Sequence, residues 1–215
     1  MQRPTRNIHD LYQLLGARFR SRRMAAFLRW YRSQSGGSIL DVGGTPEFWS
    51  GAGLNGNVTV INLEPSPERL PEEMTYVQGS ATTLPFEDGS FDVLFSNSMI
   101  EHLGARANQE RFAHEALRVG RSLWIQTPNR WFPIEPHLLT PFIHYLPTSA
   151  QRRLIRNFTT WGWITRPDRR EIEELLDELL LLDADDLRSL FPGCTLTRER
   201  VLGLTKSLIV TRSLA

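Results

Sequence analysis

An apolar strand that runs straight into two glycines constrains the fold of this chain more than any other feature. Residues 38–42 read Ser-Ile-Leu-Asp-Val, and Gly43 and Gly44 follow at once. Apolar residues occupy both faces of a strand when both faces are buried. Glycine allows a tight turn and lets the backbone come close to a ligand. The pattern predicts a buried strand that opens into a strand-to-helix turn.

Four later segments share this lack of polar–apolar alternation, namely residues 58–63, 75–78, 91–96 and 122–126. A helical pattern over residues 108–119 separates the last two. Such segments, spaced by helices or loops, are typical of a parallel sheet that is covered on both faces. We therefore expect an α/β fold of the Rossmann type.

The C-terminal part has a different pattern. Residues 183–190 form a short amphipathic segment that begins with an aspartate and ends at a Pro-Gly pair, as a capped helix does. Residues 195–201 and 206–211 then predict two strands with only a few residues between them. A connection that short fits an antiparallel hairpin.

Composition limits the class of protein. The 215 residues include 40% hydrophobic residues and carry a net charge of +1, which predicts a folded domain with a substantial core and excludes a disordered chain. A single cysteine, Cys194, excludes a disulfide framework and a Cys-rich zinc site. The chain has no apolar run of the roughly 18–20 residues that a spanning helix needs and no signal peptide, so we expect a cytoplasmic protein.

The small net charge results from two opposite segments that cancel. Residues 1–35, with a predicted helix over residues 9–34, hold eight arginines and one acid. Residues 168–186 hold nine acids and two arginines. We expect these segments to be solvated or to face each other. The alternative is that the basic segment meets phosphate, nucleic acid or an anionic membrane surface.

An acidic residue after the second strand points to a nucleoside cofactor. Glu64 lies 21 residues after Gly43, the spacing at which a carboxylate accepts hydrogen bonds from ribose hydroxyls. The third strand leads to Ser80 and Ala81, which would border the base. The glycine turn and the acid together predict a nucleotide-type site.

Six segments, taken in order, resemble the motifs of class I S-adenosylmethionine-dependent methyltransferases, most closely the methyltransferase type 11 subgroup. They are residues 39–44, 63–70, 84–93, 101–103, 126–130 and 200–208. The resemblance implies a single methyltransferase domain with a seven-stranded sheet, mostly parallel with an antiparallel C-terminal strand and helices on both faces. It also implies S-adenosylmethionine as the cofactor.

The resemblance also assigns cofactor-binding residues. Asp41, Gly43 and Gly44 would line the methionine moiety, Glu64 would hold the ribose, Ser80 and Ala81 would flank the adenine, and Ser96 and Asn97 would close the site. Two positions depart from the family pattern. Thr45 replaces the second glycine of the usual Asp-x-Gly-x-Gly loop, and Ser80 replaces the acid on the adenine side. These departures leave open a form that binds the cofactor weakly.

The chain divides into four parts: a basic N-terminal helix (1–35), a cofactor-binding half (36–130), an inserted cap (131–182), and a C-terminal helix with the hairpin (183–215). The insertion places aromatic residues beside arginines, which suits a lid over an acceptor, contact with a membrane surface, or a plain helical cap. In it, Trp161 and Trp163 alternate around a glycine as strand residues do, which suits a sugar platform or a packed core.

Two histidines are candidate general bases for an in-line methyl transfer. His102 follows the fourth strand on the ligand side of the sheet, and His137 lies in a proline-rich, aromatic loop after the fifth. A structural role, in capping a helix or packing a loop, is the alternative for each. The five histidines show no paired ligand spacing, so we expect no metal site.

The leading functional hypothesis is a methyltransferase that acts on a small-molecule, saccharide or lipid-linked acceptor. The alternative is a non-catalytic or weakly cofactor-binding relative with a regulatory role. A nicotinamide-dependent dehydrogenase would need a third glycine where Phe48 stands. A nucleic-acid methyltransferase fits the N-terminal arginines, but the net charge and the lack of an appended binding module argue against it.

Replacing Glu64 tests the predicted nucleoside site. Glu64→Ala should abolish or strongly weaken S-adenosylmethionine binding, because the ribose hydroxyls lose their acceptor. Isothermal titration calorimetry measures the dissociation constant. An unchanged value would remove Glu64 from the ribose role.

Overall fold

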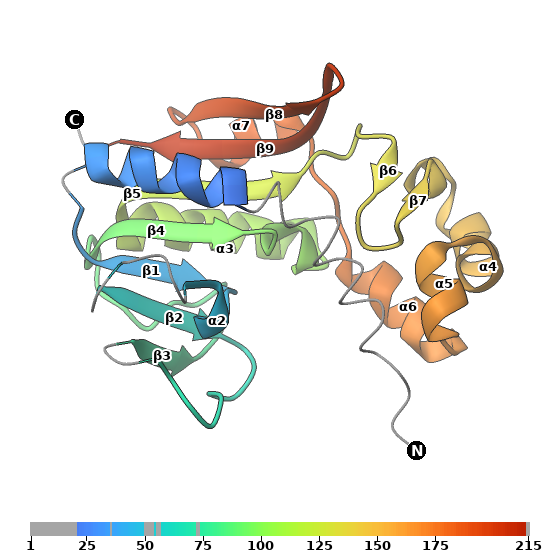
Figure 1. Ribbon diagram of the computed structural model, residues 1–215, viewed down its shortest axis with the longest axis horizontal. Helices are drawn as coiled ribbons and strands as arrows, with labels where there is room; N and C mark the ends of the chain where they lie inside the picture. Colours follow the sequence, from blue (N-terminus) through green and yellow to red (C-terminus); the bar gives the residue numbers. More distant parts are fainter. Residues whose placement is uncertain (1–20, 35, 50–53, 55–56, 72–73, 214–215) are drawn as a thin grey trace.

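The fold is built on one seven-stranded sheet with the order β3-β2-β1-β4-β5-β9-β8 (Figure 1). The computed structural model describes residues 21–34, 36–49, 54, 57–71 and 74–213. The strands are β1 (Ile39–Val42), β2 (Val58–Asn62), β3 (Thr75–Gln78), β4 (Phe91–Asn97), β5 (Gly120–Pro128), β8 (Thr195–Val201) and β9 (Leu204–Arg212). The first five are parallel, and β9 runs antiparallel between β5 and β8. The Rossmann-like sheet predicted from the sequence is confirmed.

The strand order reverses at β1, which pairs with β2 on one side and with β4 on the other. Asp41 lies in register with Val60 of β2 and Phe95 of β4, so the carboxyl ends of these strands reach the same edge. Ligands of open α/β sheets bind at such a point, outside the carboxyl ends of the strands. The glycine turn after β1 lies there.

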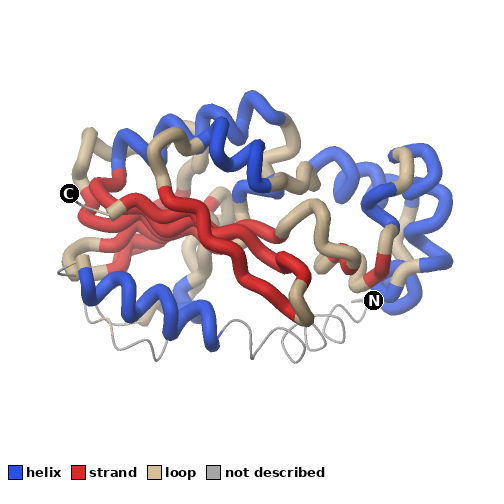
Figure 2. Tube along the Cα trace, turned by 90° about the horizontal axis from the view of Figure 1, so that it is seen from above, coloured by secondary structure: helices blue, strands red, loops and turns tan. Residues whose placement is uncertain are grey.

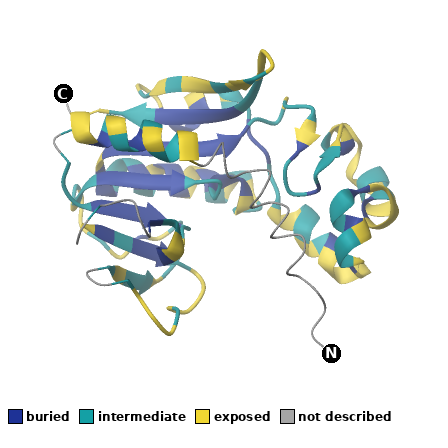
Figure 3. Cartoon of the chain, viewed as in Figure 1, coloured by how far each residue is buried: buried dark blue, intermediate teal, exposed yellow. Residues whose placement is uncertain are grey.

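Helices cover both faces of the sheet, and Figure 2 shows them above and below it. On one face α3 (Arg106–Val119) and α7 (Ala184–Leu190) pack onto the apolar side chains of β1, β4 and β5. On the other face lie a helix over residues 21–33 and the short α2 (Pro46–Trp49). Burial is greatest in the central strands (Figure 3). Apolar residues on both faces of β1 therefore have helices to pack against.

The N-terminal helix is fixed to the sheet by aromatic packing. Phe27 is fully buried, with its ring centroid 4.6 Å from that of Phe95 and 5.6 Å from that of Trp124. Residues 21–33 confirm the C-terminal part of the predicted helix, and residues 1–20 lie outside the described part of the chain.

The two segments of opposite charge do not pair with each other among the described residues. Arg22, Arg29 and Arg32 are exposed on the N-terminal helix. In the acidic segment, Glu173 pairs with Arg152 at 2.7 Å. The expectation that the segments are solvated fits these three arginines. The acidic segment is instead partly neutralised by nearby arginines of the cap, such as Arg152.

The insertion forms a cap beside the carboxyl edge of the sheet, toward which the arrows of β1, β2 and β4 point (Figure 1). Its elements are β6 (Ile134–Glu135), β7 (Thr140–Pro141), η2 (Ile143–Tyr145), α4 (Thr148–Phe158), α5 (Thr160–Thr165) and α6 (Arg169–Glu178). Leu138, Ile143, Ile155 and Ile172 give it a small core of its own. Within the described residues, no helix is both long enough and apolar enough to cross a membrane.

The strand-like reading of the Trp-Gly-Trp segment is wrong, because these residues lie in α5. The Thr159 side chain caps this helix by accepting a hydrogen bond from the Gly162 amide at 2.9 Å. A Cβ on Gly162 would lie 2.0 Å from the carbonyl oxygen of Ile155, so α4 and α5 pack too closely for a side chain there. As a result Trp161 packs against the cap core and Trp163 is 58% exposed.

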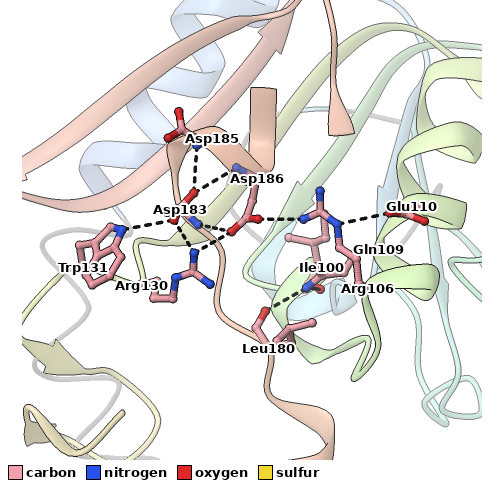
Figure 4. A network of polar contacts seen from close by, with 10 residues as sticks. All are labelled: Ile100, Arg106, Gln109, Glu110, Arg130, Trp131, Leu180, Asp183, Asp185 and Asp186. Carbon is pink, nitrogen blue, oxygen red and sulfur yellow. Dashed lines mark hydrogen bonds and ion pairs between the residues drawn. The ribbon is translucent and has the colours of Figure 1, made fainter. Parts of the chain in front are cut away.

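An arginine–aspartate network fastens both ends of the cap to the body of the protein (Figure 4). Arg130, which precedes the cap, binds the carboxylate of Asp183, which follows it, and lies 3.2 Å from the carboxylate of Asp186. Arg106 of α3 reaches Asp186 at 3.1 Å. Asp183 also caps α7 in a capping box, as the sequence predicted.

Asp183→Asn tests this network, because asparagine keeps the helix cap and removes the charge. Partial burial opposes ionisation, but the Asp186 amide and Arg130 outweigh it and lower the pKa of Asp183 to about 2. The ionised form thus stabilises the fold above pH 3.8, and this contribution disappears as the pH falls toward 2. We expect the variant to lose about 2 kcal/mol of unfolding free energy at pH 7.

Urea unfolding at several pH values measures this difference. It should shrink as the pH falls from 4 to 2 and vanish at the acid end. A deficit of the same size at pH 7 and at pH 2 would mean that the charge is not what Asp183 contributes.

Candidate active site

The turn after β1 has no room for side chains at its two glycines. Gly43 has a φ of +80°, and a Cβ there would lie 2.3 Å from Cγ of Met99. A Cβ on Gly44 would lie 1.8 Å from Oδ2 of Asp41. The Gly43 amide donates a hydrogen bond to the Ile61 carbonyl at 2.8 Å, which holds the turn against β2. Glycine at both positions therefore lets the chain turn tightly against Met99 and Asp41.

Asp41 is buried under this turn with half of its carboxylate unpaired. Oδ2 accepts a hydrogen bond from Nε1 of Trp49 at 2.6 Å, whereas Oδ1 has no partner. Burial raises the pKa of Asp41 to about 7, against the effect of the Trp49 bond. Buried polar atoms normally have a partner. The free oxygen marks a place where a bound molecule would supply one.

Glu64 stands exposed just beyond the end of β2, at the same edge. Asn62 connects it to the glycine turn, because its Nδ2 donates to the Gly44 carbonyl at 2.9 Å and its Oδ1 accepts from the Glu64 amide at 3.3 Å. The Tyr76 hydroxyl donates to the Glu64 carbonyl at 2.8 Å. The sequence offered no signal for Asn62 beyond its place at a strand end.

Ser80 and Ala81 follow β3 at this edge, and both are half-buried. The Ser80 hydroxyl lies 2.9 Å from that of Thr82 and accepts a hydrogen bond from the Thr82 amide. Ala81 packs against the core under α3. Ser80 thus shapes a turn at the edge where Asp41, Glu64 and Ala81 also lie.

Ser96 and Asn97 lie at the end of β4 but are committed to other partners. The buried Ser96 hydroxyl donates to the Val42 carbonyl at 3.0 Å and so joins the ends of β4 and β1. Oδ1 of Asn97 accepts from Nη1 of Arg23 at 2.8 Å. In this arrangement both residues brace the edge of the sheet.

Arg23 is a residue of this site that sequence reasoning missed. Besides Asn97, its guanidinium donates to Oε1 of Gln126 at 2.9 Å and to Oε2 of Glu199 at 2.9 Å. It therefore joins the N-terminal helix to β4, β5 and β8. In the sequence Arg23 was only one of eight arginines in residues 1–35. Nothing marked it out, because its partners lie 74 to 176 residues away along the chain.

Thr45, the departure from the family loop, fits its position without strain. It is exposed, it is not among the residues with positive φ, and its carbonyl accepts a hydrogen bond from Phe48 at 3.1 Å. Pro46 then begins α2, a favourable place for proline. Nothing in this turn requires a glycine at position 45.

The two candidate catalytic histidines lie together. Glu101 and His102 belong to η1 (Ile100–His102), directly after β4, and His137 comes from the cap between β6 and β7. The two imidazole rings are perpendicular, with centroids 4.6 Å apart. One donor atom each of Glu101, His102 and His137 lies within 4.8 Å of the others. We call these three residues the Glu-His-His cluster.

The Glu-His-His cluster adjoins the glycine turn and is strongly buried. Met99, which fills the space over Gly43, is two residues before Glu101. Glu101 has no exposed surface: its Oε2 accepts from the Thr127 hydroxyl at 2.8 Å, and its Oε1 has no partner. Burial raises the pKa of Glu101 to about 7 and lowers that of His102 to about 4.

Glu135 orients His137 and was not singled out in the sequence. Its carboxylate lies 2.7 Å from Nδ1 of His137 and also accepts the Leu138 amide. Burial lowers the pKa of His137, but the hydrogen bond and charge of Glu135 outweigh it and raise the pKa. A sequence signal existed in the Glu-x-His spacing within a proline-rich loop.

Comparison with known proteins agrees with this geometry. A family model described as a methyltransferase domain matches residues 40–122. An uncharacterized methyltransferase of Mycolicibacterium vanbaalenii is 37% identical over 97 residues, which cover 41% of this chain and 37% of that protein. One of Mycobacterium sp. strain KMS is 37% identical over 92 residues, covering 40% and 35%. The chain spans little more than a third of the length of these curated relatives.

Two solved structures share the fold. A Burkholderia thailandensis 1,6-didemethyltoxoflavin-N1-methyltransferase, with bound 1,6-didemethyltoxoflavin and S-adenosylhomocysteine, has a TM-score of 0.52 and 15% identity, covering 94% of this chain and 81% of that one. The PH0226 protein of Pyrococcus horikoshii has a TM-score of 0.51 and 15% identity, covering 90% and 89%. At this identity the likeness concerns the fold.

The strand order and the turn after β1 are similar to those of class I S-adenosylmethionine-dependent methyltransferases, and residues 40–122 match a methyltransferase domain model. More particularly, the model that matches these residues is that of the methyltransferase type 11 domain, a family whose cofactor is S-adenosylmethionine.

Asp41→Asn tests the electrostatics of the turn, because the amide oxygen still accepts from Trp49. With its pKa raised from 3.8 to about 7, Asp41 binds a proton on folding, so stability falls as the pH rises between these values. As the pH rises from 4 to 7, the unfolding free energy of the variant should increase relative to that of the wild type by an amount on the order of a few kcal/mol. Denaturant unfolding over this range measures the gain, and a difference independent of pH would contradict it.

Proposed function

We propose that this protein transfers the methyl group of S-adenosylmethionine to a nucleophilic atom of an acceptor bound under the cap. The observation that carries this proposal is the unpartnered, buried Oδ1 of Asp41 beneath a glycine turn at the carboxyl edge of the sheet. Such an oxygen accepts a hydrogen bond from a charged or polar group of a ligand.

The residues at this edge suit the cofactor. Asp41, Gly43 and Gly44 would receive the methionine part, and the exposed carboxylate of Glu64 would accept hydrogen bonds from the ribose. Ser80 and Ala81 would border the adenine, with Ser80 acting through its turn. Ser96 and Asn97 would act from behind, by fixing the end of β4.

S-adenosylmethionine supplies an activated sulfonium methyl, which the acceptor's lone pair takes in one in-line displacement while the C–S bonding electrons return to sulfur. The protein has to align the acceptor and exclude water. His102 and His137, whose rings lie 4.6 Å apart just after the end of β4, are the candidates to take the acceptor's proton. Glu135 keeps the His137 ring in position.

The side chains of the cap favour an acceptor with an anionic or amphipathic part, such as a lipid-linked compound or a saccharide. A small molecule with such a part also fits the proposal. Arg152, Arg153, Arg156 and Arg169 line a hollow of about 480 Å³ between α4 and α6. Phe142, Phe158 and Trp163 are about 60% exposed on the same cap. Arginines beside exposed aromatic side chains suit phosphate groups and membrane surfaces.

The non-catalytic alternative rested on Thr45 and Ser80. No described contact of either residue obstructs the turn, and Thr45 adopts an ordinary conformation. No observation therefore favours this alternative over methyl transfer.

Calorimetry tests the proposal without knowledge of the acceptor. The protein should bind S-adenosylmethionine and S-adenosylhomocysteine, and Gly44→Ala should weaken this binding at least roughly tenfold, since its Cβ would displace the Asp41 carboxylate. Thr45→Ala, a change at the next, exposed position, is the matched control and should keep wild-type affinity. Thermal unfolding of both variants reports whether the fold persists. A wild-type protein that binds neither compound would refute the proposal.

A further inference from the structure

We propose that Glu101, His102 and His137 hold a divalent transition-metal cation, and that this cation binds the acceptor oxygen next to the methyl donor. The first part stands on the geometry of the Glu-His-His cluster alone. The second part rests on the proposed function.

The donor atoms are close enough to share one ion. They lie within 4.8 Å of one another, and ligands about 2.0–2.2 Å from a metal lie roughly 3–3.5 Å apart. Side-chain rotations that move the donor atoms by about 1 Å would bring them to the separations expected around one ion. Two imidazoles and one carboxylate leave further coordination positions open, as catalytic metal sites do.

A buried oxygen without a partner provides independent support. Oε1 of Glu101 has no hydrogen-bond partner, and the Glu101 side chain has no exposed surface. Leaving a carboxylate in this state is costly unless a positive group pairs with it. Its other oxygen is held by the Thr127 hydroxyl at 2.8 Å, which aims the carboxylate in one direction.

The surroundings of His137 resemble the outer layer of a metal site. Glu135 binds Nδ1 of His137 at 2.7 Å and is itself held by the Leu138 amide. Histidine ligands commonly have their second ring nitrogen bound by a carboxylate in this way, which fixes the ring and its tautomer.

The donor types favour zinc, cobalt, manganese or iron over magnesium and calcium. Imidazole nitrogen suits the transition series, whereas magnesium and calcium prefer oxygen ligands throughout. Cys194, the free thiol of the chain, lies in another part of the fold, at the start of β8. The site is therefore a nitrogen–oxygen site.

With a bound cation, the proton of the acceptor hydroxyl would be lost in a different way than to a histidine base. An acceptor hydroxyl bound to a divalent cation loses its proton more readily. The oxygen then forms its bond to the methyl carbon, the C–S bond breaks with its electrons on sulfur, and the proton leaves to water. Because an imidazole lone pair cannot bind a metal and a proton at once, the two roles of His102 and His137 exclude each other.

Cobalt titration tests the site directly. The full chain, made without a histidine tag and treated with a chelator, is titrated with Co²⁺ and followed by its visible absorption, then with Zn²⁺ by calorimetry. We expect one ion per chain. Glu101→Gln and His137→Ala should each weaken binding by at least about tenfold, and Glu135→Gln should weaken it by a smaller factor. His114→Ala, which removes an exposed histidine of α3, is the matched control and should leave metal binding unchanged.

Circular dichroism of each variant separates loss of the site from loss of the fold. The metal site would be refuted if the wild type bound neither Co²⁺ nor Zn²⁺. It would also be refuted if folded Glu101→Gln and His137→Ala bound these ions as tightly as the wild type. S-adenosylhomocysteine binding is measured on the same metal-free protein. If that binding persists while no metal binds, the proposed function stands and this inference fails. Metal binding without cofactor binding would leave the ion site and refute the proposed function.

Discussion

The close contact between Asp41 and Gly44 is the constraint on which the functional edge of this protein depends. With 1.8 Å between Oδ2 of Asp41 and the place of a Cβ on Gly44, the chain must turn at this point with no side chain. The turn sets the start of α2, and Trp49 of that helix returns a hydrogen bond to Asp41. One carboxylate thus organises the end of β1, the turn and the next helix.

Two carboxylates at this edge are buried with one oxygen each unpaired. Asp41 lies under the glycine turn, Glu101 lies in η1 after β4, and burial raises the pKa of each to about 7. Groups of this kind reduce stability and are concentrated where proteins bind ligands. Both lie at the carboxyl edge of the sheet, where open α/β sheets bind ligands.

The cap takes part in the site because it is fastened at both of its ends. Arg130 and Asp183, at its entry and its exit, are joined by an ion pair, and the chain after α6 runs along η1, where the Leu180 amide donates to the Glu101 carbonyl at 2.8 Å. These contacts hold the loop that carries Glu135 and His137 against the end of β4. Glu101 after β4 and His137 of the cap thus come together at one edge.

Strands, turns and their order were determined by the sequence alone, because they depend on short-range patterns. Unalternated apolar segments, the Gly43–Gly44 pair and the Asp183 cap each express a local preference of the backbone, and their order predicted the sheet and the placing of Asp41 and Glu64. The Trp161–Trp163 segment failed for the same reason: an i, i+2 pattern around a glycine is compatible with strand and helix, and packing of α5 on α4 decided it. Only the tertiary structure decided the contacts between distant residues. Arg23 meets Glu199 where the N-terminal helix crosses β4, β5 and β8, and Glu101 meets His137 where the end of β4 faces the cap loop; no spacing along the chain encodes either contact.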